Sequence, residues 1–251
     1  MLQIFLNSFI EIDLKIKFYL FSMDKYIITA NNILIVLGLY IIIAVFLSLN
    51  TNYQKIKLEK QMYIIKNVVK SLVLLYVGFF SSIDFIYFIY NEEFEMNAVY
   101  DYASFYVAND FIALLIVPNL PKTTILHHKI TCLFLVYTLH VDFNSIENVG
   151  QLLFIYTIFS SYAFLVNFYL GIRFLKNKND SKSLLNNIIN NSKKYAYYIY
   201  TISCIINWFI HIVLLSYRAY LGVFNLHYML YSGLLYFIIK DDLILMSWLK
   251  N

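Results

Sequence analysis

The sequence predicts an all-α protein that crosses a membrane about seven times. Of its 251 residues, 61% are hydrophobic and only 14% are charged, whereas a soluble domain is about half apolar and a quarter charged. Two prolines and six glycines leave the apolar runs largely unbroken. Unbroken runs favour helices over the alternating strands of an outer-membrane barrel. The two cysteines, Cys132 and Cys204, lie inside apolar runs and predict no disulfide framework.

Residues 1–26 are predicted to form an interfacial segment that lies on the membrane surface. Residues 1–19 alternate apolar side chains with charged ones and have no basic stretch before their apolar part. They therefore lack the layout of a cleavable signal peptide and have the amphipathic character of an interfacial segment. Behind it we expect a first transmembrane helix with its cytosolic loop (27–59), a main domain (60–247) and a C-terminal tail (248–251).

Seven apolar stretches are candidates for transmembrane helices, because a span needs roughly 20 mostly apolar residues. They lie near 28–49, 71–90, 97–117, 124–141, 148–172, 196–217 and 225–246. The third stretch is interrupted by Asp101, Asn109 and Asp110, and the fourth is short. Hydropathy alone supports these two stretches weakly.

The charges of the connecting loops alternate in sign along the chain, as expected if each stretch crosses the membrane once. Residues 50–70 carry five lysines and one glutamate, whereas residues 91–101 carry four acidic side chains and no base. The alternation continues with Lys122 and Lys129, then Asp142 and Glu147, and then the six bases of residues 173–194. The positive-inside rule places the basic loops and the C-terminus in the cytosol and the N-terminus in the lumen, with Arg218 as the one exception. The net charge of +4 is therefore juxtamembrane, and no nucleic-acid partner is expected.

The adjacent histidines His127 and His128 are the strongest candidates for a functional site. Ionisable side chains are costly at membrane depth and are functional by default. The helical rise of about 1.5 Å per residue places Asp110 and Asn167, from two other stretches, in the same layer. Thr131 follows one turn later on the same face. We predict a cavity open to the cytosol, in which a histidine acts as general base or acyl acceptor and Asp110 orients it.

Other polar residues of the apolar stretches are weaker candidates. Asn109, Asn167, Thr131, Asn207 and His211 are predicted to bind substrate, although an interhelical hydrogen-bond cluster is the alternative for the whole set. For Asn207 and His211, which share a helix face at spacing i, i+4, this structural alternative is favoured. It is also favoured for three residues nearer the lumenal side, Asp84, His140 and His227.

The segment Tyr106-Val-Ala-Asn-Asp110, followed by a short link and by Leu126-His-His-Lys-Ile-Thr131, resembles the TLC domain family, which includes the ceramide synthases. The resemblance covers about residues 60–247. It implies a barrel of six helices around a lipid-accessible cavity, plus one additional span. In ceramide synthases the paired histidines and nearby acidic residues carry N-acyl transfer from acyl-CoA to a sphingoid base. The matching residues here are His127, His128 and Asp110.

One departure from the family pattern concerns the helix that follows the His pair. Family members have an acidic residue there, but no Asp or Glu lies between Glu147 and Asp180 in this chain. The chain therefore resembles the small TLC-domain proteins, with roles in membrane lipid composition, more closely than full ceramide synthases. A role in lipid synthesis, together with the missing signal peptide, predicts a location in the endoplasmic reticulum.

Several functions remain open at this point. The first is a lipid acyltransferase that uses acyl-CoA as co-substrate, without a bound cofactor or metal. The second is a non-catalytic lipid-binding protein or regulator of membrane composition. A seven-helix receptor is disfavoured, because the last two stretches contain no proline and no Asp-Arg-Tyr triplet ends the third. Five scattered histidines are too few for a His-rich di-iron hydroxylase or desaturase.

Overall fold

The computed structural model describes residues 2–91, 95–141, 143, 145–176 and 184–251, with side chains described from residue 24 onward except for Asn91. This described part is helical, with no strand, which confirms the predicted all-α class. The elements are α1 (Leu2–Ser48), α2 (Thr51–Gln54), α3 (Leu58–Asn91), α4 (Met96–Ile116), α5 (Lys122–Thr138), α6 (Gly150–Ser161), α7 (Phe164–Ile172), the 3-10 turn η1 (Arg173–Leu175), α8 (Leu184–Tyr220) and α9 (Leu226–Lys250).

Several of these helices are long and apolar enough to cross a membrane. Among the described residues they are Asp24–Ser48, Leu58–Tyr90 and Leu184–Tyr220, and the bent pair of α6 and α7 makes a fourth if it is one span. Helices also occupy the three other predicted stretches, as α4, α5 and α9, but none of these is among the helices that are both long and apolar enough to cross a membrane. The helices fit an integral membrane protein, and the complete seven-span layout stays a prediction.

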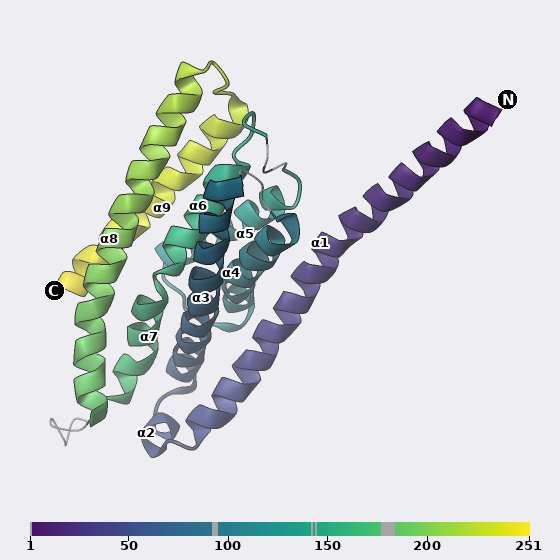
Figure 1. Ribbon diagram of the computed structural model, residues 1–251. Coiled ribbons are helices and arrows are strands. Elements are labelled where there is room, and N and C mark those ends of the chain that lie inside the picture. Colours follow the sequence, from purple (N-terminus) through teal and green to yellow (C-terminus); the bar gives the residue numbers. More distant parts are fainter. Residues whose placement is uncertain (1, 92–94, 142, 144, 177–183) are drawn as a thin grey trace.

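The helices pack in a closed order around a common interior. Contacts join α3 to α4, α4 to α5, α5 to α9, α9 to α8, and α8 to α7, which returns to α3. Helix α1 packs outside this ring, against α3 and α4. Its N-terminal part projects away from the other helices, and it continues without a break across residue 26 (Figure 1). The interfacial role of that part stays a prediction.

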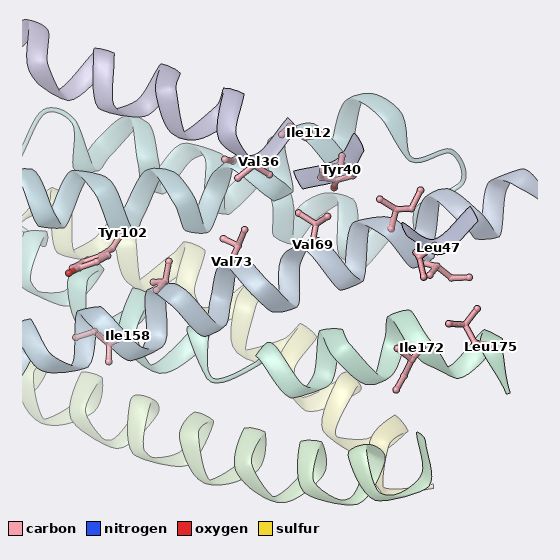
Figure 2. Packing of buried hydrophobic residues seen from close by; sticks show 14 of the residues in the cluster. Val36, Tyr40, Leu47, Val69, Val73, Tyr102, Ile112, Ile158, Ile172 and Leu175 are labelled. Carbon is pink, nitrogen blue, oxygen red and sulfur yellow. The ribbon is translucent and has the colours of Figure 1, made fainter. Parts of the chain in front are cut away.

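A cluster of buried aliphatic and aromatic side chains fixes α1 and α7 to α3. Val36 of α1 and Val69 of α3 are fully buried, and Ile172 of α7 lies at the opposite side of α3 (Figure 2). The helix faces that point away from the other helices are also apolar. Ile41 and Phe46 of α1, for example, are exposed over two thirds of their surface. Because lipid is as apolar as these side chains, close packing rather than exclusion of water holds such helices together.

Two glycines allow α6 and α7 to approach α3 closely. A Cβ atom at Gly171 would lie 2.8 Å from Cγ2 of Val68, and one at Gly78 would lie 2.7 Å from Oγ of Ser161. Small residues are common where membrane helices touch. These contacts place α7 beside the first turns of α3, where the candidate site lies.

The stretch predicted as a span near 148–172 is a bent pair of helices, because α6 and α7 meet at an angle of 41°. The hydroxyl groups of Ser160 and Ser161 donate to the backbone carbonyls of Tyr156 and Ile158. The backbone N–H of Ala163 then bonds to the carbonyl of Ser160, three residues back. Serine hydroxyls that compete for helix carbonyls bend helices in this way.

Parts of two predicted loops are helical. Helix α3 begins at Leu58 within the predicted loop 50–70, and α8 begins at Leu184 within the predicted loop 173–194. Both helices carry their first basic residues on amphipathic turns, which a search for apolar runs assigns to loops. The loop charges Glu92, Glu93, Asp142, Lys178, Asp180 and Lys182 lie outside the described residues.

Candidate functional site

The link between α4 and α5 brings the predicted acidic residue next to the His pair. It is the five-residue segment Val117-Pro-Asn-Leu-Pro121, and Asn119 adopts a left-handed conformation with φ of 57°. Asparagine tolerates this region better than most residues, and Pro121 supplies the residue that precedes the first turn of α5. A link this short makes α4 and α5 antiparallel neighbours.

Asp110 of α4 is the centre of a buried polar network. Its Oδ1 atom forms an ion pair with Lys70 of α3 and lies 3.1 Å from Nδ1 of His128. The other oxygen, Oδ2, accepts a hydrogen bond of 3.0 Å from the hydroxyl of Thr131. The His128 contact has ion-pair distance, but the ring is not aligned for a hydrogen bond. The structure thus brings Asp110, His128 and Thr131 together as the sequence predicts.

The second histidine contacts a carboxylate from α9. Nδ1 of His127 lies 3.2 Å from Oδ2 of Asp241, while the next residue, Asp242, accepts a hydrogen bond of 2.7 Å from the hydroxyl of Tyr200. The two imidazole rings lie 5.9 Å apart between centroids. Each histidine therefore has its own carboxylate, one from α4 and one from α9.

The two histidines line a cavity of about 370 Å³. It lies where the first turns of α3 and α5 meet α7, the middle of α8 and the last turns of α9. Its charged and amide-bearing lining residues are Lys66, Asn67, Lys70, His127, His128, Asn167, Arg173, Asn207, Asp241 and Asp242. Tyrosines add hydroxyl groups to the wall, namely Tyr63, Tyr106, Tyr156 and Tyr200. Asn167 and Asn207 are thus placed at the cavity, as predicted.

Some buried polar atoms of the cavity wall have no hydrogen-bond partner in the described part of the chain. They include Nε2 of His128, Oδ1 of Asn67 and Oδ1 of Asn207. His128 itself is only 3% exposed. Buried polar groups are almost always paired in folded proteins, so three unpaired atoms in one cavity indicate a place that receives a polar ligand or water.

Asn109 and His211 are placed elsewhere, although the sequence predicts both as substrate-binding. Asn109 accepts a hydrogen bond of 3.0 Å from the hydroxyl of Tyr40 in α1, because it points about 100° around the helix from Asp110. His211 lies beyond the cavity, with Nε2 at 2.7 Å from the hydroxyl of Tyr231. Both contacts join helices, and neither residue lines the cavity.

The three predicted lumenal-side candidates have structural contacts as well. Asp84 accepts a hydrogen bond from Tyr102, and His227 contacts the hydroxyl of Tyr137. His140 lies 2.7 Å from the backbone carbonyl of Val136. None of the three lines the cavity.

Sequence reasoning missed five charged residues of the cavity. Lys66 and Lys70 were counted with a loop, although both are inside α3 and buried. Asp241 and Asp242 form an acidic pair within an otherwise apolar helix, and Arg173 ends α7. The rule that singled out the histidines, an ionisable residue inside an apolar stretch, applies equally to Asp241 and Asp242.

No group of three or more His, Cys, Asp or Glu side chains in the described residues is placed to hold a metal ion. Compared with protein-family models, curated protein sequences and solved structures, the chain matches none. Its function is therefore argued from the geometry of the cavity.

Proposed function

We propose that the protein is a TLC-type membrane acyltransferase, which transfers an acyl group from a thioester such as acyl-CoA to an amine or hydroxyl of a membrane lipid. The observation that carries the proposal is the pairing of Asp110 with His128 at the wall of a cavity, with Nε2 of the ring unpaired. A carboxylate on one side of an imidazole and a free nitrogen on the other is the arrangement of a general base.

The chemistry follows from the protonation of the ring. With the Nδ1 proton directed toward Asp110, Nε2 of His128 has a lone pair that takes the proton of the attacking amine or hydroxyl. The nucleophile then forms a bond to the thioester carbonyl carbon, whose oxygen becomes an oxyanion. When this intermediate collapses, the carbon–sulfur bond breaks and the proton on His128 passes to the leaving thiolate. Catalytic hydrogen bonds are often poorly aligned before substrate binds, as the His128 contact is here.

His127 has a supporting role in this proposal. Its own carboxylate, Asp241, holds it 5.9 Å from His128, where it can hold the substrate or donate a proton to the leaving group. Asp241 and Asp242 supply the acidic character that the family places on the helix after the His pair. The chain thus differs from the family pattern in which helix provides the carboxylates. They come from α9 and not from α6.

The arrangement of the helices supports the wider proposal. A closed order of contacts through α3, α4, α5, α9, α8 and α7 is what a six-helix barrel would have, with α1 as the additional span, and it supports that arrangement. A volume of about 370 Å³ is within the range of about 300–1,000 Å³ for small-molecule pockets. With the basic loops on the cytosolic side, the cavity opens to the cytosol of an endoplasmic reticulum membrane.

The proposal is tested by acyl transfer in membranes that contain the protein. Labelled acyl-CoA is supplied with a panel of sphingoid bases and lysolipids, and His128→Gln and His127→Gln are compared with the wild type. We expect His128→Gln to lower the rate at least a hundredfold, because general-base catalysis contributes about 10²–10⁴-fold. His211→Gln, in a histidine outside the cavity, is the matched control and should keep the wild-type rate.

Two results would overturn the proposal. One is a folded wild-type protein that forms no labelled product with any acceptor, which would favour the alternative of non-catalytic lipid binding. The other is a His128→Gln variant that folds and keeps full activity, which would place the chemistry elsewhere. A test of folding, by size-exclusion chromatography and thermal unfolding in detergent, accompanies each variant.

A further inference from the structure

Two cations at the cavity have no carboxylate partner. Lys66 of α3 is 4% exposed and lines the cavity, yet no carboxylate of the described residues lies within ion-pair distance of it. The same is true of Arg173 at the end of α7, whose Nε is buried and has no hydrogen-bond partner in the described chain. Buried charges are costly unless they are paired.

The carboxylates of the cavity are already engaged with other groups. Asp110 pairs with Lys70, Asp241 contacts His127, and Asp242 accepts a hydrogen bond from Tyr200. Lys66 and Arg173 are therefore two cations of the cavity lining that no carboxylate of the described residues contacts directly. A ligand with negative charge would supply that contact.

The two cations share an aromatic neighbour, Tyr63. Lys66 lies 6.0 Å and Arg173 lies 5.8 Å from the ring centroid of Tyr63. The guanidinium also lies 4.7 Å from the ring of Phe174 and 4.8 Å from the ring of Trp248. Stacking on ring faces leaves the in-plane N–H groups of an arginine free, and these groups match the geometry of phosphate oxygens.

We propose that Lys66 and Arg173 form a subsite for a phosphate ester, which holds the phosphate of an amphiphilic ligand while its apolar part extends between the helices. The amide groups of Asn67 and Asn207 line the same cavity and each retain an unpaired oxygen. They can accept hydrogen bonds from hydroxyl or amine groups of the same ligand. The subsite deepens the proposed function, since it shares the cavity with His128, but it concerns binding and does not require acyl transfer.

Two sources of a phosphate ester reach a cytosolic cavity in a membrane: a lipid headgroup and the coenzyme A portion of an acyl thioester. Both have the same charge and oxygen geometry at the phosphate. The cavity volume of about 370 Å³ lies near the lower end of ligand pockets. This size favours a lipid headgroup over a nucleotide that would have to share the cavity with the acyl chain.

Binding of lysophosphatidic acid to the full chain in an uncharged detergent tests the subsite. Trp248 supplies the signal, because its ring lies 4.8 Å from Arg173 and its fluorescence responds to a bound phosphate. The monoacylglycerol of the same chain length has no phosphate and is the ligand control. We expect lysophosphatidic acid to bind at least tenfold more tightly than the monoacylglycerol, as one charge-assisted hydrogen bond provides.

Variants then test whether the two cations cause the difference in affinity between lysophosphatidic acid and the monoacylglycerol. Lys66→Gln and Arg173→Gln should each lose about tenfold or more of the affinity for lysophosphatidic acid, whereas Lys66→Arg should keep it. Lys57→Gln removes an exposed cation just before the same helix and is the matched control. Arg173 is only half-buried, so its variant remains informative if Lys66→Gln does not fold.

The outcomes separate the possibilities. Equal binding of the two lipids, or an equal loss of affinity in Lys57→Gln, would overturn the subsite. Displacement of lysophosphatidic acid by free coenzyme A at similar concentration would identify the thioester carrier as the source, and failure of displacement would identify the lipid headgroup. If the wild-type protein binds the phosphate lipid but shows no acyl transfer, the proposed acyltransferase function is contradicted and the subsite is not.

Discussion

Lys70, which lines the cavity, and Asp110 form a buried ion pair, although 40 positions separate them in the chain. Their side chains are 7% and 0% exposed, so water does not screen the pair. The same Asp110 oxygen that meets Lys70 also lies 3.1 Å from His128. A lysine of α3 thus holds in place the carboxylate that orients the histidine. The same contact therefore stabilises the packing of α3 against α4 and positions the proposed catalytic base.

Loss of one partner of this ion pair should destabilise the protein strongly. We expect Asp110→Asn to lower the free energy of unfolding by about 3–5 kcal/mol, because it leaves a buried ammonium group uncompensated. The double variant Asp110→Asn/Lys70→Met should lose less than Asp110→Asn alone, since no unpaired charge remains. Unfolding in detergent measures both, with Glu95→Gln as an exposed control. Equal losses in the single and double variants would contradict the ion pair.

The hydroxyl of Thr131 should position Asp110 for its contact with His128. Thr131→Val keeps the shape of the side chain but removes the 3.0 Å hydrogen bond to the carboxylate. We expect a loss of about 1.5–3 kcal/mol of stability, as for hydrogen bonds to charged groups, and a lower rate of acyl transfer. Thr131→Ser retains the hydroxyl and should retain most of both. If Thr131→Val is as stable and as active as Thr131→Ser, the hydroxyl of Thr131 does not position Asp110.

The helices and one half of the site could be predicted from the sequence for a simple reason. Apolar runs and helical rise are local properties of the chain, and they place Asp110, His128 and Thr131 on two consecutive helices joined by five residues. A short link leaves little freedom in how two helices meet. The contact of His128 with Asp110 follows from spacing and depth alone.

The other half of the site depends on packing between distant parts of the chain. Asp241 reaches His127 only because α9 closes against α5 more than a hundred residues later, and no local pattern determines that contact. Lys66 and Lys70 could not be predicted for a different reason. A hydropathy search ends a span at a lysine, whereas an amphipathic helix can direct its lysines toward a cavity and its apolar side chains outward.

The close approach of α7 to α3 should depend on the absence of a side chain at Gly171. In Gly171→Ala the new Cβ would lie 2.8 Å from Cγ2 and 3.2 Å from the backbone nitrogen of Val68, so α7 must shift. We expect a loss of about 1–3 kcal/mol in unfolding free energy, as for overpacked interiors, and weaker ligand binding because Asn167 and Arg173 move with the helix. Gly38→Ala is the control, since a Cβ there meets nothing within 4 Å. Similar effects of the two substitutions would show that packing at Gly171 is not close.

The predicted topology can be read from single cysteines introduced at exposed connections, after both native cysteines are replaced by alanine. In intact microsomes a membrane-impermeant maleimide reaches only the cytosolic side. We expect it to label Lys122→Cys and Asn251→Cys at once, because three crossings put Lys122 and seven crossings put Asn251 on the cytosolic side, where α3 begins. Glu147→Cys and Phe224→Cys should react only after the membrane is permeabilised. These four sites decide on α4, α5 and α9, the helices whose length and apolarity leave their crossing open. Protection of Lys122→Cys in intact microsomes would mean that α4 and α5 return to the lumenal side without crossing, and the cavity that begins at His127 would then not open to the cytosol.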